Sequence, residues 1–545
     1  MKIYYLFILN ILNYIYKLIK KVFLKLFIII SIFFFFLIFI IYKENKNLNN
    51  DEKKALLFNI NGIIFENNNN NLWGKFGLSL FGIKQKKFLT NTLFNIVKII
   101  YLASNNKNIV GIVLKLNKFL GADQVSLEYI GKALNQFKKK GKYIYAISDN
   151  YKLAQYYLAS YANKIFIYPE GLIDLYGLNN DKIYYKSLLN KLKINSHIFK
   201  IGLNKTAIES NIYDNMPKKT KKIEKKIYSK LWLNYIYDIS INRKIKPYKL
   251  IFKKNFYKNI LRKQDISKYN LKYKIIDKIL SYKKIKEEFI KIFGLNKKRN
   301  NYKFINFYKY KIKKLIDNNN VISVIFINGK ILNYNNSYKN VCSSIIINKL
   351  KKARFNSKVK AVILRINSPG GSINASENIR NEILNLKLSG KPVIVSMSNL
   401  TASGGYWVSI PANIIIADKN TITGSIGIFS IINTYEKILN FIGINYDSLN
   451  LFPNLNLKYN KSLTPYTSKI IELNIKSGYE HFIKLISKNR HLTPIEVNHI
   501  AQGQLFIGED AKKKKLVDKI GDFDYAVKQA VIISGLKKWH LNWVI

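Results

Sequence analysis

Residues 156–165 read YYLASYANKI, and residues 406–415 read YWVSIPANII. The second stretch begins 250 residues after the first (406 against 156), and GIVLKLN at 111–117 recurs at the same distance as AVILRIN at 361–367. Self-similarity at one fixed distance indicates a structural unit that is present twice. A chain of 545 residues also exceeds the usual size of one hydrophobic core. We therefore expect two domains of the same fold.

Each copy of the repeat alternates short, β-branched apolar runs with stretches of helical periodicity. The predicted strands are 113–116, 143–148, 164–168, 362–366, 393–398 and 414–417, and the predicted helices are 126–140 and 376–388. Near-continuous apolar strands between helices are typical of α/β domains whose parallel sheets are covered on both faces. The lysine-rich, weakly patterned residues 283–320 are interpreted as the connection between the two halves.

The sequence is strongly basic, with 91 Lys and Arg against 32 Asp and Glu and a formal net charge of +59. Such an excess is typical of proteins that bind nucleic acids or anionic membranes. Lysine, asparagine, isoleucine and tyrosine are abundant along the whole chain, so compositional drift is the favoured interpretation and no nucleic-acid partner is expected. A basic membrane-surface or nucleic-acid binder stays open as an alternative function. The single cysteine, Cys342, excludes an internal disulfide.

The N-terminal region contains a charge-free apolar run of 17 residues, 26–42. As a helix it would be about 26 Å long, close to the ~30 Å hydrocarbon core of a bilayer. Four lysines precede the run between residues 17 and 25, and the positive-inside rule then places the N-terminus in the cytoplasm and the bulk of the chain outside. No small-residue cleavage pattern follows the run, so residues 1–46 are predicted to form an uncleaved transmembrane anchor.

Two glycine motifs distinguish the second copy of the repeat from the first. One is NSPGGS at 367–372 and the other is TASGGY at 401–406, and each follows a predicted strand and precedes a helix. Backbone N–H groups exposed at such turns can bind an anion or an oxyanion, and Ser403 can present its hydroxyl at the start of a helix. An ordinary tight turn and an N-cap serine are the alternatives. Because Leu153 stands opposite Ser403 in the first copy, a shared capping role is disfavoured.

A nucleophilic serine requires a base. The five histidines are His197, His481, His491, His499 and His540, and none lies in a stretch that reads as an active-site loop. This observation does not exclude a Ser–His–Asp triad, although nothing indicates one. Lysine is the other candidate, but the chain contains too many lysines for spacing alone to select one.

These motifs resemble the family of signal peptide peptidase A, also called protease IV, in its long bacterial form. The similarity extends from about residue 56 to residue 534. Besides the repeat, it is carried by IYYKSLLNKLK at 183–193, NSPGGSINASE at 367–377, ASGGYW at 402–407, ANIIIAD at 412–418 and residues 422–429. The resemblance implies an α/β fold of two tandem ClpP/crotonase-like domains, at 47–300 and 301–545, behind the transmembrane helix. It also implies assembly as a homotetramer.

The resemblance further implies the site residues. Ser403 matches the family's nucleophile, and Lys205, in NKTAIE at 204–209, matches its general base. Ser425 matches the serine that orients this lysine. The oxyanion hole would be formed by the backbone N–H groups of Gly370, Gly371 and Gly404. No metal and no cofactor is implied. The lysine comes from the first copy and the serine from the second, so neither half is complete alone.

A membrane-anchored serine endopeptidase with a Ser–Lys dyad is therefore the expected function. Its expected substrates are signal peptide remnants and other hydrophobic peptides. The resemblance places it in the bacterial inner membrane, with the catalytic part in the periplasm at the outer face. Two further alternatives stay open: a crotonase-like acyl-CoA enzyme, and a non-catalytic scaffold descended from the protease. The departures from the family are Asn204 and Thr206 beside the lysine, and Cys342-Ser343-Ser344 in place of a glycine pair.

Overall fold

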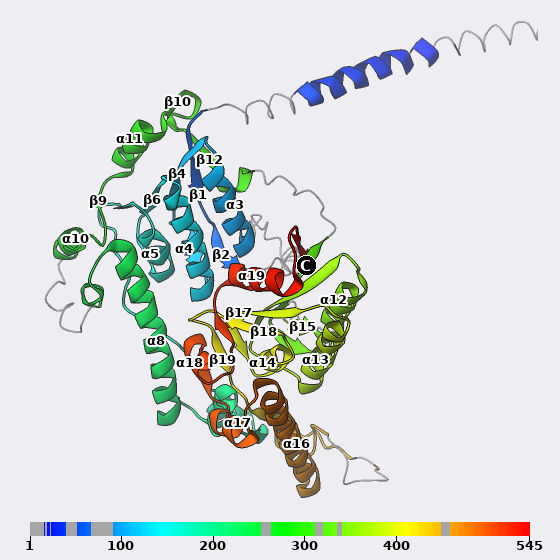
Figure 1. The fold of residues 1–545 in the computed structure, drawn as a ribbon. Helices are drawn as coiled ribbons and strands as arrows, with labels where there is room; N and C mark the ends of the chain where they lie inside the picture. The colour runs from blue at the N-terminus through cyan, green and yellow to red at the C-terminus, as the bar shows by residue number, and fades with distance from the viewer. Residues whose placement is uncertain are drawn as a thin grey trace, which may run out of the picture. The chain divides into compact units, whose positions relative to one another are not determined.

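The computed structural model describes residues 16, 19–21, 23–39, 52–66, 91–251, 263–310, 320–334, 340–447, 449 and 458–544 (Figure 1). The chain divides into two compact units, Met1–Lys54 and Ala55–Ile545. The first unit contains a helix, Ile19–Phe39, with a mean hydropathy of 2.9. In the described part of the chain it is the one helix long and apolar enough to cross a membrane. It begins earlier than the predicted span of 26–42, and residues 40–42 lie outside the description.

The first half of the second unit is built on a six-stranded sheet in the order β12-β1-β4-β6-β7-β9. These strands are β1 (Lys54–Phe58), β4 (Ile109–Lys115), β6 (Tyr143–Ser148), β7 (Lys164–Ile167), β9 (Lys278–Ile279) and β12 (Phe304–Asn306). Successive side chains of a strand face opposite sides of a sheet. Accordingly, Leu56 and Phe58 of β1 belong to one apolar cluster, and Ala55 and Leu57 belong to another.

Helices cover both faces of this first sheet. Residues of α3 (Leu93–Asn105), α4 (Gln124–Lys139), α5 (Leu153–Ser160) and the long α8 (Lys218–Arg243) pack in the cluster that contains Leu56. Residues of α11 (Tyr282–Phe293) pack in the cluster that contains Ala55. The sheet is therefore buried on both sides, as its near-continuous apolar strands predict.

The second half contains a mainly parallel sheet in the order β21-β19-β17-β16-β13-β23, with β18 and β22 attached beside β17. These strands are β13 (Val321–Asn328), β16 (Val359–Ser368), β17 (Val393–Ala402), β18 (Ile414–Ala417), β19 (Ile422–Gly424), β21 (Leu505–Ile507), β22 (Lys519–Ile520) and β23 (His540–Val544). Its larger helices are α12 (Ser343–Phe355), α13 (Ile373–Leu388), α16 (Pro465–Arg490) and α19 (Phe523–Ser534). The predicted fold class, two α/β halves, is confirmed by the two sheets.

Strand β17 has different neighbours in its first part and at its end. Residues 394–396 pair with β18, whereas residues 400–402 pair with β19. The end of β17 therefore lies where the neighbouring strands β18 and β19 separate. The next residue, Ser403, begins a sharp change of direction into α14 (Gly404–Ser409).

The repeat is visible in individual hydrogen bonds as well as in the sequence. Tyr156 donates its hydroxyl to the carbonyl oxygen of Ile275 (2.8 Å), and Tyr406 donates to that of Leu516 (2.8 Å). Other equivalent pairs are Arg243–Asp277 with Arg490–Asp518, and Asn163–Ile144 with Asn413–Val393. The halves are thus copies in their packing as well as in the order of their elements.

Residues 283–320 are more than a connection, which corrects the sequence interpretation. They contain α11, the strand pair β10 (Leu295–Asn296) and β11 (Asn301–Tyr302), and β12, while residues 311–319 lie outside the description. Ile285, Phe289 and Phe293 recur every four residues on α11 and are buried, which explains a helix in a lysine-rich segment. Strand β12 pairs with β1, so residues that the expected division at 300 assigns to the second half add to the first sheet.

A two-stranded antiparallel ribbon joins the halves. Strand β8 (Asn195–Ile201), from the first half, pairs with β20 (Ile428–Thr434), from the second, and Ile201 lies opposite Ile428. Lys419 of the second half also contacts Glu128 (3.2 Å) and Asp238 (2.8 Å) of the first. The ribbon carries the residues that follow β8 onto the second half, beside the end of β17.

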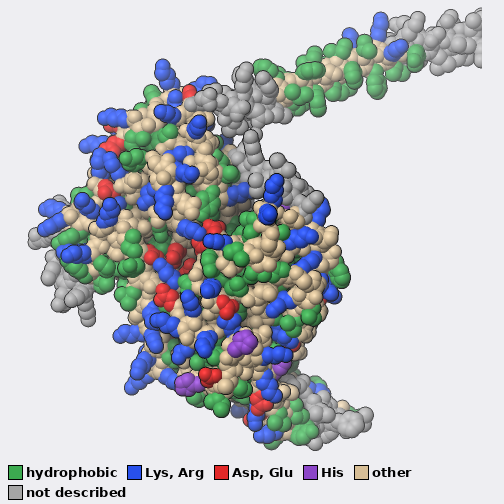
Figure 2. All heavy atoms as spheres, in the orientation of Figure 1, with side chains coloured by type: hydrophobic (Ala, Val, Ile, Leu, Met, Phe, Trp, Pro, Cys, Tyr) green, Lys and Arg blue, Asp and Glu red, His purple; other side chains and the backbone are tan. Residues whose placement is uncertain are grey.

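Figure 2 shows how basic side chains are distributed on one face of the second unit. On the face drawn in Figure 2, Lys and Arg lie over many elements instead of gathering on one. This distribution is what compositional drift predicts, whereas a nucleic-acid site would concentrate basic side chains in a stripe or patch.

Candidate active site

Ser403 occupies the turn between β17 and α14. Its backbone angles are φ 53° and ψ −119°, a combination that residues with a side chain rarely adopt. Its N–H donates to the carbonyl oxygen of Gly424 (2.9 Å), which holds the turn against β19. Its side chain makes no capping hydrogen bond to α14. The hydroxyl is therefore not used as an N-cap, and the strained turn is similar to the one that presents a nucleophile in α/β hydrolases.

Lys205 brings an amine to this hydroxyl from the other half. It follows β8, and only 2% of the residue is exposed. Its Nζ lies 3.0 Å from Ser403 Oγ, although the two residues are 198 positions apart in the sequence. Nζ also donates to Ser425 Oγ (3.0 Å) and to the main-chain carbonyl oxygen of Ser425 (2.8 Å). The structure thus brings together the three side chains that the sequence singles out.

Burial lowers the pKa of the Lys205 amine from 10.5 to about 7. The cause is desolvation, because an ammonium ion loses its hydration in this site. Its polar contacts are two hydroxyls and a carbonyl, and none of them carries a negative charge that would stabilise the ammonium form. A lysine with a pKa near 7 is partly neutral at neutral pH, which is the state that a base requires.

The proline–glycine turn after β16 packs against Ser403. Gly370 has φ +100°, and a Cβ built there would lie 2.6 Å from Gly404 N and 2.8 Å from Ser403 Cβ. Only glycine permits this approach. The N–H of Gly370 donates to Ser368 Oγ (3.1 Å), whereas no hydrogen bond within the described chain uses the N–H of Gly371 or Gly404. Two backbone donors are therefore available beside the serine.

The histidines do not contact the serine. His197 lies in the ribbon, 3.0 Å from Thr434 Oγ1, and His481 lies 3.9 Å from Glu377. In the part of the chain that the structure describes, Ser403 has no hydrogen bond or ion pair with any histidine. The geometry therefore gives a Ser–His–Asp triad no support.

Two contacts in the site are not indicated by the motifs. The carbonyl oxygen of Ser425 is a main-chain group without a sequence signature, yet it lies closer to Lys205 Nζ than the hydroxyl does. Ser368 holds the N–H of Gly370, and its place inside the NSPGGS motif is the one signal that could have identified it. Among the residues for which side chains are described, no three His, Cys, Asp or Glu are grouped to hold a metal ion.

A protein-family model matches parts of both halves. The model of Peptidase family S49 matches residues 136–251 and 385–537, which are corresponding parts of the two halves. The second range contains Ser403 and Ser425, and the first contains Lys205.

Similar full-length proteins agree with this match. The chain is 42% identical over 490 residues to Protease 4 of Salmonella typhi, covering 89% of this chain and 79% of the relative. It is 36% identical over 480 residues to Protease 4 of Haemophilus influenzae, covering 87% and 78%. It is 27% identical over 440 residues to the chloroplastic serine protease SPPA of Arabidopsis thaliana, covering 78% and 63%.

Solved structures match shorter parts of the chain. A mutant of ClpP1 from Listeria monocytogenes covers 37% of this chain and 94% of its own, with 16% identity and a TM-score of 0.26. A mutant of the membrane-bound stomatin-specific protease 1510-N covers 42% and 98%, with 16% identity and a TM-score of 0.28.

Proposed function

Because this chain belongs to peptidase family S49 and is a serine protease, we propose that Ser403 is its nucleophile and Lys205 its general base. One observation carries the proposal: the Lys205 amine is buried, has its pKa lowered to about 7, and lies 3.0 Å from Ser403 Oγ. A base has to lie within hydrogen-bond reach of the proton that it removes and has to be unprotonated at the working pH. Lys205 meets the first condition, and a pKa of about 7 leaves part of its amine unprotonated at neutral pH.

The first chemical step is acyl transfer to the serine. Ser403 Oγ attacks the carbonyl carbon of the scissile peptide, and its proton passes to Lys205 Nζ as the new C–O bond forms. The carbonyl electrons move onto the oxygen. The hydroxyl and the carbonyl of Ser425 both accept hydrogen bonds from Lys205 Nζ. These two bonds direct the lone pair of the neutral amine at the hydroxyl of Ser403.

The second half of the reaction returns the enzyme to its first state. When the tetrahedral intermediate collapses, the C–N bond breaks and the leaving amine takes the proton from Lys205. Water then attacks the acyl-enzyme, Lys205 accepts its proton, and the ester bond to Ser403 breaks with return of that proton to Oγ. The pair gives one proton to the leaving amine and regains one from water, so it ends the cycle in its first protonation state.

The oxyanion needs backbone donors. Gly371 and Gly404 are the better pair among the three predicted glycines, because the N–H of Gly370 already donates to Ser368 Oγ (3.1 Å). A Cβ built on Gly404 would lie 3.0 Å from Gly371 N, so the two amides are close neighbours. One such donor typically lowers the reaction barrier by about 3 kcal/mol.

The substrates we propose are signal peptide remnants and other hydrophobic peptides. The support is the family resemblance of the motifs, together with the apolar helix Ile19–Phe39, which would hold the protease at a bilayer. The four lysines between residues 17 and 25, which precede the apolar run 26–42, favour an N-terminus in the cytoplasm and a catalytic unit at the outer face of a bacterial inner membrane.

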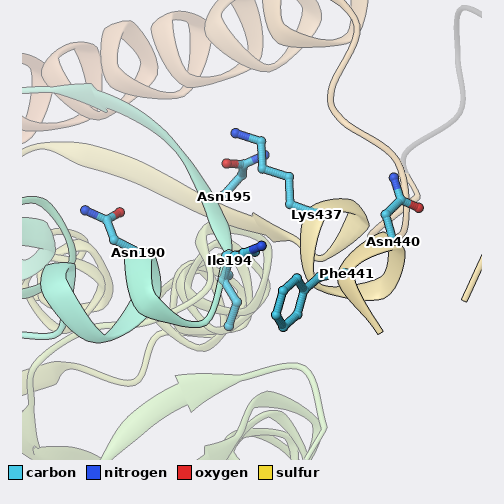
Figure 3. Close-up of a pocket in the computed structure, with 7 residues that line it drawn as sticks. Asn190, Ile194, Asn195, Lys437, Asn440 and Phe441 are labelled. Carbon is cyan, nitrogen blue, oxygen red and sulfur yellow. The ribbon is translucent and has the colours of Figure 1, made fainter. Parts of the chain in front are cut away.

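We also propose that copies of the chain assemble, as a tetramer by family resemblance. The support is a pair of equivalent helices, α6 (Lys186–Lys191) and α15 (Glu436–Phe441), in which no side chain is buried. They border a hollow of about 730 Å³ at which Phe441 and Ile194 lie side by side (Figure 3). Leu188 and Phe441 are exposed on the two helices, and burying such residues is a common contribution of subunit interfaces.

Oligomer size tests this surface. The double variant Leu188→Lys with Phe441→Lys should lower the mass measured by light scattering in detergent. Leu388→Lys is the control, since Leu388 is a leucine on another helix that is more exposed than Leu188 (85% against 51%), and its replacement should leave the mass unchanged. Equal masses for wild type and the double variant would remove this surface from the proposal.

The catalytic assignment is tested with the full-length chain in detergent and a hydrophobic fluorogenic peptide. Ser403→Ala and Lys205→Met should each lose activity by about 10³-fold or more, while Lys200→Met, an exposed lysine on the same strand β8, should keep it. A folded Ser403→Ala protein that still cleaves would refute the assignment. An acylating inhibitor should label Ser403, which distinguishes a protease from an acyl-CoA enzyme or an inactive scaffold.

A further inference from the structure

Three glycines meet where the chain leaves β8 towards Lys205. They are Gly202 at the end of the ribbon, Gly427 before β20, and Gly503 before β21. A Cβ built on Gly202 would lie 3.0 Å from Gly503 N, and one built on Gly427 would lie 2.9 Å from Ile201 O and 3.2 Å from Gly503 Cα. Three backbone segments therefore approach each other more closely than side chains would allow.

Gly503 makes the closest approach to the lysine. Its φ is +73°, and a Cβ built on it would lie 2.6 Å from Lys205 N, 2.8 Å from Lys205 Cα and 2.9 Å from Lys205 Cβ. These atoms are main chain or directly attached to it, so they cannot swing aside as the end of a flexible side chain can. Any other residue at 503 would have to displace the Lys205 backbone.

The turn at 501–504 also ties the two segments that carry the site. The N–H of Asn204 donates to the carbonyl of Gln502 (2.8 Å), on the lysine side. On the serine side, the N–H of Gly503 donates to the carbonyl of Ile426 (2.7 Å), and the N–H of Ser425 donates to the carbonyl of Gln504 (2.7 Å). One short turn thus fixes the backbone on both sides of the Lys205–Ser425 contact.

Hydrogen bonds from the Gln502 side chain hold the turn in place. Gln502 has φ 52°, and its Nε2 donates to Asn498 Oδ1 (2.9 Å) and to the hydroxyl of Tyr479 (3.2 Å). Two consecutive residues, Gln502 and Gly503, therefore have a left-handed backbone conformation, which residues other than glycine rarely adopt. The side-chain bonds offset the cost of that conformation at Gln502.

We propose that the turn at 501–504 is a positioning element of the peptidase, in which Gly503 lets the backbone close over Lys205 and so holds its amine between Ser425 and Ser403. This inference rests on the proposed roles of Lys205 and Ser403. Gly503 touches neither substrate nor reacting atoms. It acts through Lys205, by fixing where the lysine lies and by excluding water from one side of it.

Two effects follow from adding a methyl group at Gly503. Displacement of the Lys205 backbone lengthens the contact between Nζ and Ser403 Oγ, which lowers kcat and leaves KM nearly unchanged because no substrate contact is removed. Water that enters beside the amine stabilises the ammonium form, so the pH at which Lys205 loses its proton rises.

The test compares Gly503→Ala with Gly141→Ala in the full-length protein. Gly141 is the matched control, because its φ is +76° against +73° at Gly503 and a Cβ built there meets nothing within 4 Å. Both variants place alanine at a similar left-handed φ, but only Gly503→Ala contacts Lys205. We expect kcat of Gly503→Ala to fall about tenfold or more and the rising limb of its pH profile to move up by about one unit. Gly141→Ala should keep the wild-type kcat and the wild-type position of the rising limb of the pH profile.

A second readout does not depend on activity. Competitive acetylation with acetic anhydride between pH 5 and 11, quantified by mass spectrometry, reports the pKa of the Lys205 amine directly. It should be higher in Gly503→Ala than in wild type and unchanged in Gly141→Ala. If Gly503→Ala does not fold, Gln502→Gly replaces it, because glycine keeps the left-handed conformation and loses the bonds to Asn498 and Tyr479.

The outcomes separate the two proposals. A folded variant of the turn whose kcat and Lys205 pKa match those of Gly141→Ala would overturn the positioning role. Activity that survives in Ser403→Ala would instead overturn the catalytic assignment, and the acetylation measurement would still decide whether the turn controls the lysine.

Discussion

Glu66 and Arg365 form a buried ion pair that joins the two halves of the molecule. Arg365 Nε lies 3.0 Å from Glu66 Oε1, and the residues are only 3% and 5% exposed. Arg365 also donates from Nη1 to Ser396 Oγ (2.9 Å) and to the carbonyl of Met397 (3.1 Å). Arg365 lies on β16, and Ser396 and Met397 lie on β17, so Arg365 connects the two strands that end at the glycine turn and at Ser403.

Removing one partner of this pair should be costly. Arg365→Met leaves the Glu66 carboxylate buried without a counter-ion, and we expect a loss of about 3–5 kcal/mol in the free energy of unfolding, measured by denaturant titration. The double variant Glu66→Gln with Arg365→Met should recover most of that loss, since neither charge of the pair is left. A double variant as unstable as the single one would show that the loss in the free energy of unfolding comes from altered packing and not from the unpaired charge.

The lowered pKa of Lys205 predicts a pH-dependent stability. The amine has a pKa of about 7 in the folded chain against 10.5 as its ordinary value. Between these values the unfolded state binds more protons, so wild type gains stability relative to Lys205→Met as pH rises, by at most about 1.4 kcal/mol per pH unit. Urea unfolding at pH 7, 8 and 9 measures this slope.

The control for that slope is Lys200→Met. Lys200 is exposed on β8, so its removal should leave a stability curve parallel to wild type. If Lys205→Met were also parallel to wild type, the folded pKa of Lys205 would be close to its ordinary value. The base would then be protonated at neutral pH.

Ser425→Ala should reduce activity without abolishing it. The change removes one contact to Lys205 Nζ, at 3.0 Å, but leaves the Ser425 carbonyl at 2.8 Å. A hydrogen bond of this kind contributes about 1 kcal/mol, which corresponds to a roughly fivefold to tenfold lower kcat. Ser430→Ala, on the neighbouring strand β20, serves as the control in the same peptide assay. A loss as large as that of Lys205→Met would mean that the hydroxyl takes part in proton transfer itself.

Gly370→Ala should disrupt the turn that faces Ser403. The added Cβ would lie 2.6 Å from Gly404 N and 2.8 Å from Ser403 Cβ, both in the site. Because loss of one oxyanion donor alone costs about 10²–10³-fold in kcat, we expect a loss of at least that order. Gly390→Ala has a similar left-handed φ of +79° with open space around it, and should keep full activity. Comparable activity in both variants would exclude this turn from the site.

The sequence indicated which residues lie together in the candidate site, but it did not indicate the residues that surround them. Ser403 could be singled out because the repeat offers Leu153 as an internal comparison, and Lys205 because a family motif surrounds it. The duplicated α/β fold followed from apolar runs with clear periodicity. These features depend on residue types and spacing, which a sequence displays directly.

The remaining features depend on three-dimensional approach. Gly503 is one of 26 glycines, and nothing in its neighbourhood indicates that its missing Cβ faces Lys205. Glu66 pairs with a residue 299 positions away, and the Ser425 carbonyl is a group that every residue carries. Helix α11 was not predicted, because charged residues separate its three buried apolar residues and hide their periodicity in the sequence.

The division of the site between the halves has a consequence for the newly made protein. The ribosome synthesises the first half before the second, so Lys205 is made while Ser403 is still to be synthesised. With the proposed roles, no cleavage is possible until β8 has paired with β20 and the 501–504 turn has closed behind Lys205. The order of synthesis therefore delays cleavage until both halves are present and paired.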